Sequence, residues 1–309
     1  MNANANAGLN VQVVIVDPQN DFCVAEETVD YTLADGTVVK VPTGNKGALV
    51  VPGALEDMQR VATMIDRIGP KVDEIHVTMD SHQMMGIERP SWWKNSHDGT
   101  HPDPFTVLGL TPDNRIVAVD MSSGSPVLTD VEYTTFTPRK YDAARAYLKA
   151  LTDGGRYMHV VWTFHCVVGT WGWSIVPVLS KALCNWELKE EARINYVPKG
   201  NNPDTEHFSG VRAEVPDPGD HSTQVNDNLI KMLAEADIIA MTGEALSHCL
   251  ANTTRDIAAL FTDPKYVAKL VLLTDSTSNV GGFEFLGDAF MAEMKDLGMK
   301  TSTTVDFLA

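Results

Sequence analysis

The segment VQVVIVDPQNDFC, residues 11–23, indicates the fold class, because an apolar, β-branched run ends abruptly in a polar turn. Near-continuous apolar runs are typical of strands buried on both faces, as in a parallel sheet covered by helices. Similar runs follow at residues 74–80, 158–164, 237–243 and 269–276, and a weaker one at 302–308 is a candidate edge strand. The pattern predicts a mostly parallel six-stranded sheet.

Helical periods alternate with these runs. Residues 54–68 place their apolar side chains on one stripe, and residues 141–151, 223–236, 248–261 and 285–298 behave similarly. This alternation predicts an α/β fold that is doubly wound and Rossmann-like, with three layers and helices on both faces of the sheet.

Two stretches interrupt the alternation and read as insertions. Residues 24–50 contain the hairpin-like YTLADGTVVKV with an Asp-Gly turn, and residues 106–140 contain two candidate extra strands, at 113–121 and 125–137. Because no linker or internal repeat separates the elements, we expect a single domain over residues 1–309.

The composition limits the class of partner. The 309 residues carry 24 Lys and Arg against 41 Asp and Glu, a net charge of −17. This charge repels nucleic acids and anionic membranes, so we expect neither as a partner. The four cysteines form no disulfide framework, and the start MNANANAGLN does not resemble a signal peptide. We therefore expect a cytoplasmic protein whose partner is a small molecule.

Polar residues follow the expected strands at their carboxyl ends, where sheets of this class bind ligands. Asp17 ends the first run and serves either as a turn former or, if buried, in proton transfer. Asp80 and His82 follow the second, and residues two apart in an extended segment point to the same side. His165 follows the third run and offers a third ligand. One carboxylate with imidazoles suits zinc, iron or manganese.

Two thiols are candidates for a nucleophile. Cys166 directly follows His165, but Cys249 opens an expected helix, whose free N–H groups favour a thiolate and an oxyanion. We therefore prefer Cys249, with a small buried thiol of the core as the alternative. Lys199 follows another short apolar run, and a buried ammonium near Asp17 would stabilise both the thiolate and the carboxylate.

Six motifs in a fixed order carry a family resemblance. They are VIVDPQNDFC (14–23), VPGA (51–54), TMDSH (78–82), WTFHCVVGTWG (162–172), VPKGNNPDTEHFSG (197–210) and GEALSHCLANTTRDIA (243–258). Together they resemble the nicotinamidase (pyrazinamidase) branch of the isochorismatase-like cysteine hydrolases, over residues 11 to about 285.

The resemblance implies a catalytic triad of Asp17, Lys199 and Cys249. In such a hydrolase Cys249 attacks the amide carbon of nicotinamide, Asp17 takes the thiol proton, and a thioester is hydrolysed to nicotinate after ammonia leaves. The oxyanion would lie on the backbone N–H groups of Ala245 and Cys249, next to an expected cis peptide between Glu244 and Ala245.

The resemblance also implies one divalent metal ion, with Asp80, His82 and His165 as its ligands. Zinc is preferred, and iron or manganese stays open. The ion would orient the pyridine nitrogen of the substrate. Phe22 and Trp162 would form aromatic walls for the ring, and the family resemblance leads us to expect a homo-oligomer.

Departures from the family pattern leave the substrate open. Glu88 stands where relatives often have a histidine, and it is a candidate fourth ligand, substrate contact or loop residue. His101 is a further candidate ligand, and Ser247 replaces an acidic or amide side chain. The alternatives are a related amidase acting on another small amide or carbamoyl compound, and a non-catalytic binding protein that keeps the fold.

Overall fold

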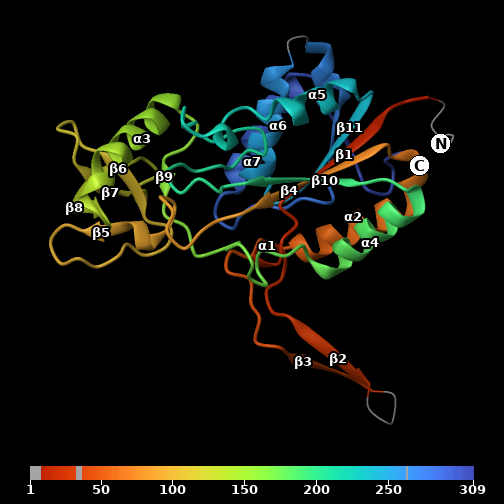
Figure 1. Ribbon diagram of the computed structural model, residues 1–309, viewed down its shortest axis with the longest axis horizontal. Helices are drawn as coiled ribbons and strands as arrows, with labels where there is room; N and C mark the ends of the chain where they lie inside the picture. The colour runs from red at the N-terminus through yellow and green to blue at the C-terminus, as the bar shows by residue number, and fades with distance from the viewer. Residues whose placement is uncertain (1–7, 33–36, 262–263) are drawn as a thin grey trace.

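A parallel six-stranded sheet forms the centre of the computed structural model, which describes residues 8–32, 37–261 and 264–309 (Figure 1). The strand order is β10-β4-β1-β11-β12-β13, and all five neighbouring pairs are parallel. The prediction of a mostly parallel six-stranded sheet is confirmed. Its strands are β1 (Val11–Val16), β4 (Glu74–Asp80), β10 (Ile194–Lys199), β11 (Ile238–Gly243), β12 (Leu270–Leu273) and β13 (Lys300–Ser302).

Helices cover the sheet on two sides. Val13 and Ile15 of β1 share a hydrophobic cluster with α2 (Ala54–Ile68) and α4 (Pro177–Glu190). Val14 and Val16 instead share a cluster with α5 (Asp227–Glu235), α6 (Cys249–Leu260) and α7 (Glu284–Asp296). Successive side chains of a strand point to opposite faces, so burial on both sides explains the unbroken apolar run. Figure 1 shows α2 and α4 on one side of the sheet, with α5, α6 and α7 on the other.

A separate five-stranded antiparallel sheet, in the order β5-β8-β7-β6-β9, is built from residues 93–160, a longer stretch than the insertion expected at 106–140. Helix α3 (Tyr141–Gly154) packs on it through a cluster that includes Trp93, Leu108 and Leu148. The two extra strands expected in residues 106–140 are confirmed as β7 and β8. The strands are β5 (Trp93–Asn95), β6 (Val107–Leu110), β7 (Ile116–Asp120), β8 (Val127–Thr135) and β9 (His159–Val160).

The prediction that residues 158–164 form a strand of the central sheet is wrong. Only His159 and Val160 are extended, as β9 at the edge of the antiparallel sheet, and β10 takes the sixth place in the central sheet. The chain after β9 crosses to the end of β4, where the His82 N–H donates to the Cys166 carbonyl at 3.0 Å. Periodicity alone does not separate such a buried crossing segment from a strand.

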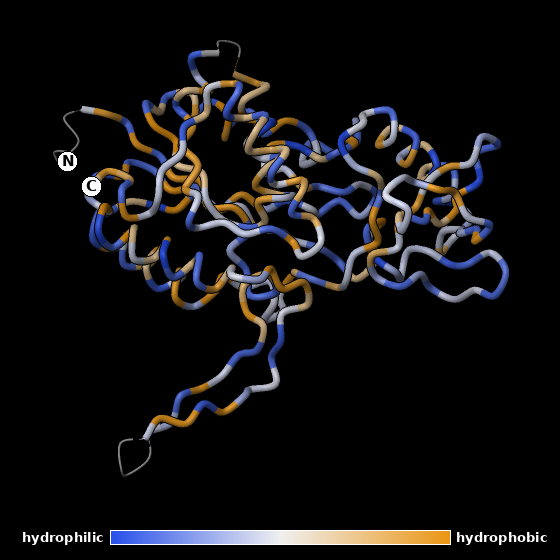
Figure 2. The backbone as a smooth tube through the Cα atoms, turned by 180° about the vertical axis from the view of Figure 1, so that it is seen from behind, coloured by the Kyte–Doolittle hydropathy of each residue, from blue (hydrophilic) through white to orange (hydrophobic). Residues whose placement is uncertain are grey.

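Other differences lie at element ends. The edge strand expected at 302–308 is realised only as β13, at residues 300–302, and α4 lies in a stretch where no helix was expected. Residues 24–50 form the hairpin of β2 (Thr28–Thr32) and β3 (Val38–Pro42), whose expected Asp-Gly turn lies outside the described residues. The hairpin projects from the body in Figures 1 and 2. Within the described part of the chain, no helix has the length and apolarity needed to cross a bilayer.

A buried histidine on β4 makes stability depend on pH. The His76 Nε2 lies 3.0 Å from Gln12 Oε1, and its Nδ1 accepts from the Asn195 amide at 2.9 Å, so the neutral ring has both nitrogens paired. Burial lowers the pKa of His76 to about 4. Because this value lies below the ordinary value of 6.5, the stability it contributes is present above pH 6.5 and is lost as the pH falls through 4.

When the pH is lowered from 7.5 to 5, the unfolding free energy of the wild-type protein should fall by about 2 kcal/mol more than that of His76→Gln, which has no imidazole to protonate. Urea unfolding at the two pH values measures this difference. Equal losses in the two proteins would contradict the assignment.

Candidate active site

The polar turn after β1 holds together the edge of the sheet where the site lies. Gln19 donates to the carbonyls of Asp80 and Trp173 at 2.7 and 2.9 Å, and it accepts from the Asp80 N–H at 2.7 Å. Asp21, in the short helix α1 (Asn20–Cys23), accepts from the Cys166 N–H at 2.6 Å. The DPQNDF motif therefore fixes the end of β4 and the crossing segment around Cys166 in one arrangement.

The three predicted triad residues meet at this edge. Asp17 follows β1, Lys199 ends β10, and Cys249 begins α6; all three are buried. The Lys199 Nζ lies 2.9 Å from Asp17 Oδ2 and 3.5 Å from Cys249 Sγ. It also donates to Asp80 Oδ1 at 2.9 Å, while Asp17 Oδ1 accepts from the Thr78 hydroxyl at 2.6 Å. A single ammonium thus links the thiol to two carboxylates.

Burial controls the protonation of these groups. It raises the pKa of the Cys249 thiol well above its usual value, although Lys199 acts in the opposite direction. Cys249 does begin a helix, as expected, but its burial opposes the thiolate that a helix start favours. Burial also raises the pKa of Asp17, opposed by Lys199. Lys199 keeps its charge because Asp17 and Asp80 outweigh its burial and raise its pKa.

The turn before α6 presents two free backbone donors. The peptide between Glu244 and Ala245 is cis, as predicted. None of the described residues accepts a hydrogen bond from the N–H of Ala245 or of Cys249. Gly243 makes the turn sterically possible, since it has φ 109° and a Cβ there would lie 2.2 Å from the Val16 carbonyl oxygen. The arrangement leaves two N–H groups for an oxyanion.

Asp80, His82 and His165 form a buried group whose ligand atoms all lie within 4.8 Å of one another. Asp80 Oδ2 is 2.9 Å from His82 Nε2 and 3.3 Å from His165 Nε2. Two ligands bound at about 2.1 Å to one ion lie about 3.0–3.4 Å apart, so this spacing fits one metal ion. Burial raises the pKa of Asp80, but His82 and Lys199 outweigh it and keep the group ionised. The donor set of one oxygen and two nitrogens suits zinc, iron or manganese.

Two residues behind the histidines hold the rings in place. Glu88 Oε1 lies 3.0 Å from His82 Nδ1 and 3.1 Å from Arg89 Nε, and it is outside the group of metal-ligating atoms. The His165 Nδ1 lies 3.0 Å from the Thr163 carbonyl, to which it donates when Nε2 is the metal ligand, and the buried Arg89 donates to the His165 carbonyl at 2.8 Å. Its place beside His82 fits none of the three roles considered for Glu88, but that of a support for a metal ligand. Sequence reasoning missed Arg89, since no spacing marks it.

His101 is not brought to this group. Its Nδ1 donates to the Trp93 carbonyl at 2.6 Å, beside the antiparallel sheet. The expectation that it could be a further ligand is therefore corrected.

We expect Glu88→Gln to weaken zinc binding about 10- to 100-fold, because an imidazole that loses its carboxylate partner is a weaker and less well oriented ligand. Competition with a chromophoric chelator measures the affinity. The matched control is His101→Gln, which should bind zinc like the wild-type protein. Equal affinities for all three proteins would contradict the role of Glu88.

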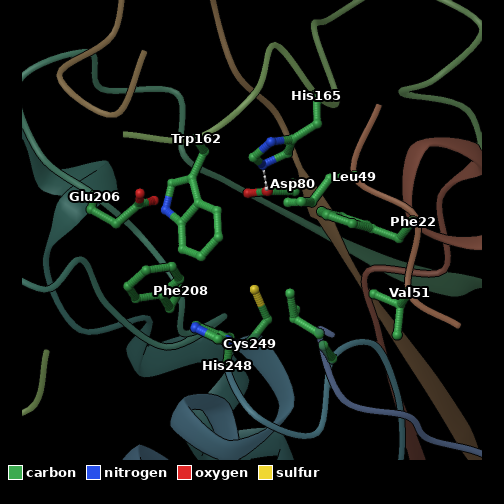
Figure 3. A pocket seen from close by; sticks show the side chains of 12 residues that line it. Phe22, Leu49, Val51, Asp80, Trp162, His165, Glu206, Phe208, His248 and Cys249 are labelled. Atoms are coloured by element: carbon green, nitrogen blue, oxygen red, sulfur yellow. Dashed lines mark ion pairs between the residues drawn. The ribbon is translucent and has the colours of Figure 1, made fainter. Parts of the chain in front are cut away.

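A cavity lies between the thiol and the metal-ligating group (Figure 3). The predicted walls Phe22 and Trp162 both line it, and Trp162 contacts His248 edge-on, with ring centroids 5.4 Å apart. Glu206 and Phe208 also line it, within the segment 197–210 that carries the resemblance. No pattern in the sequence singles them out. The lining residues are Phe22, Leu49, Val51, Asp80, Trp162, His165, Glu206, Phe208, Ala245, His248, Cys249 and Val280.

The fold of the chain is similar to that of proteins with solved structures. No family model matches the sequence, and no curated protein matches it. Solved structures do: yeast nicotinamidase has a TM-score of 0.55 and 19% identity, covering 94% of this chain and 98% of its own. The fold is that of the nicotinamidases. A nicotinamidase/pyrazinamidase from Acinetobacter baumanii has a TM-score of 0.56 at 16% identity, covering 97% of this chain and 99% of its own. These structural similarities confirm the fold that the motif resemblance implies.

Proposed function

We propose that the chain is a metal-containing cysteine amidohydrolase that converts nicotinamide to nicotinate and ammonia. One observation carries this proposal: Lys199 Nζ lies within 2.9 Å of Asp17 and 3.5 Å of Cys249, at a cavity bounded by Asp80 and His165. A nucleophile, its proton acceptor and a metal-ligating group that share one cavity support amide cleavage. The nicotinamidase fold agrees with this function.

The chemistry begins with a proton transfer from the Cys249 thiol to Asp17. Lys199 keeps its charge throughout and stabilises the thiolate. The thiolate attacks the amide carbon, and the oxyanion accepts from the N–H groups of Ala245 and Cys249. Asp17 returns its proton to the amide nitrogen, the C–N bond breaks, and ammonia leaves a thioester. Asp17 then takes a proton from water, whose oxygen attacks the thioester, and the acid leaves as Cys249 regains a proton.

Binding of the ring involves the other wall of the cavity. Asp80, His82 and His165 would hold a metal ion, zinc in preference to iron or manganese. When bound, it would supply a Lewis acid that orients the pyridine nitrogen. Phe22, Trp162 and Phe208 supply aromatic surface. Asp80 and His165 line the same cavity as these aromatic side chains, so the ring would bind between them and the metal-ligating group.

Ammonia release from a panel of amides tests this proposal. We expect zinc-loaded protein to release ammonia from nicotinamide and pyrazinamide, chelator-treated protein to lose this activity, and added zinc to restore it. Release from N-carbamoyl amino acids alone would favour the related amidase instead. No release from any amide by zinc-loaded protein would contradict both.

A further inference from the structure

The carboxyl group of Glu206 is a polar feature that the proposed hydrolysis does not use. Glu206 is 5% exposed and lines the cavity. Its Oε1 accepts from the His207 N–H at 2.9 Å, whereas its Oε2 has no hydrogen-bond partner among the described residues. Figure 3 shows this carboxyl on the side of the cavity opposite Phe22 and Val51. An unpaired acceptor therefore stands at one end of the cavity, across from Phe22 and Val51.

A free donor belongs to the same end of the cavity. The indole Nε1 of Trp162 is buried and, within the described part of the chain, likewise lacks a partner. Figure 3 shows the indole between Glu206 and the rest of the cavity. A buried polar group left unpaired costs about 1–3 kcal/mol, and such groups are few in folded proteins. Two of them on one cavity wall give a ligand both an acceptor and a donor with which to pair.

The surroundings of Glu206 favour a donor as that group. No ion pair joins Glu206 to a cation among the described residues, so its acceptor capacity is not neutralised by the protein. Burial, helped by the negative charge of Glu88, raises the pKa of Glu206 to about 7. An N–H donor on a ligand would relieve this unfavourable burial, while a second carboxylate would add to it.

We propose that Glu206 is a specificity-determining residue that accepts a hydrogen bond from an N–H donor on the ring of the substrate. This inference rests on the proposed amide hydrolysis and names its preferred substrate class: heteroaromatic carboxamides with an amino substituent. The Trp162 N–H pairs with a ring nitrogen or other acceptor beside that substituent. Unsubstituted nicotinamide leaves the Glu206 acceptor unpaired and is the poorer substrate.

Pairs of substrates that differ in one group test the proposal. We would measure kcat/KM for the 2-, 5- and 6-aminonicotinamides and for the methylnicotinamides with the same substitution positions. At pH 8, where a Glu206 carboxyl with a pKa of about 7 is mainly ionised, the wild-type protein should prefer the amino compound over its methyl counterpart by about 10-fold or more at one position, the usual effect of a hydrogen bond to a charged group. Glu206→Met should bring this ratio close to one. A wild-type ratio near one at every position, or an unchanged ratio in Glu206→Met, would overturn the proposal.

Glu214→Met is the matched control. Glu214 is also a carboxyl with an unpaired oxygen, and burial raises its pKa to about 7, but it does not line the cavity. Its replacement should leave the amino-to-methyl ratio at the wild-type value. An equal fall of the ratio in Glu206→Met and Glu214→Met would trace the effect to general disturbance and overturn the proposal.

Ligand binding to Cys249→Ala tests recognition without turnover. Because this variant keeps Glu206, the result does not depend on whether Glu206→Met folds. Calorimetry with the same amino and methyl compounds should show tighter binding of one amino compound. That result, together with no turnover of any amide by the wild-type protein, would support Glu206 recognition and contradict the hydrolase. Turnover of nicotinamide with equal binding of all amino and methyl compounds would overturn the Glu206 proposal alone.

Discussion

Replacing Cys249 with Ala is expected to lower the turnover of nicotinamide by at least about 10⁴-fold, the effect typical of removing a catalytic nucleophile. Cys249 is the thiol that lies 3.5 Å from the Lys199 Nζ and faces the cavity. The unfolding free energy should change far less, because one sulfur atom beside a cavity contributes little to packing. Ammonia release and urea unfolding measure the two effects.

Cys166→Ala is the matched control, since Cys166 is also a buried thiol near the site. Its fixed contact is a backbone one, the N–H that donates to Asp21, and this contact survives the substitution. The variant should keep its activity within a few-fold of wild type. Residual hydrolysis by Cys249→Ala, or a loss in Cys166→Ala as large as that in Cys249→Ala, would contradict the choice of nucleophile.

Lys199→Met should have the largest effect on stability, a loss of about 3–5 kcal/mol of unfolding free energy. Lys199 is buried and pairs with Asp17 and Asp80 at 2.9 Å each, so its removal leaves the buried Asp17 without a cation and leaves Asp80 with His82 alone. Activity should fall as well, because the thiolate of Cys249 also loses its positive neighbour. Urea unfolding at neutral pH measures the change in stability.

Lys40→Met provides the comparison for this effect. Lys40 pairs with Asp30 at 3.1 Å on the projecting hairpin, where both side chains are more than half exposed. Exposed pairs contribute about 0–1 kcal/mol, so this variant should unfold like the wild-type protein. Destabilisation of Lys199→Met no greater than that of Lys40→Met would contradict the claim that Lys199 stabilises the buried carboxylates.

The central sheet was predictable where burial on both faces leaves an unbroken apolar run, as in β1. The same signal failed at 158–164, since a segment that crosses the core is as apolar as a strand. Strand β10 was not predicted, because its sequence does not form an unbroken apolar run. β10 contains Pro198, which is tolerated because β10 is an edge strand. Helix α4 did carry a signal, a proline in its first turn and a buried stripe that includes Leu179, Leu183 and Trp186.

The residues that carry chemistry were predictable because they follow strands and belong to recognisable motifs. Asp17, Lys199 and Cys249 come together as the motifs imply. Arg89 and Glu206 were not predictable, because both are buried in loops whose position the sequence does not give. The burial that raises the pKa of Cys249 was not predictable for the same reason. The helix start is local and visible in the sequence, while the depth of burial depends on the whole fold.

Trapping with hydroxylamine tests the central claim, a nicotinoyl thioester on Cys249, most directly. Hydroxylamine competes with water for a thioester and converts it to a hydroxamate. With zinc-loaded wild-type protein and nicotinamide, we predict nicotinohydroxamate that increases as nicotinate decreases, and none with Cys249→Ala. Nicotinate formation at an unchanged rate with no hydroxamate, or hydroxamate formation by Cys249→Ala, would contradict the account.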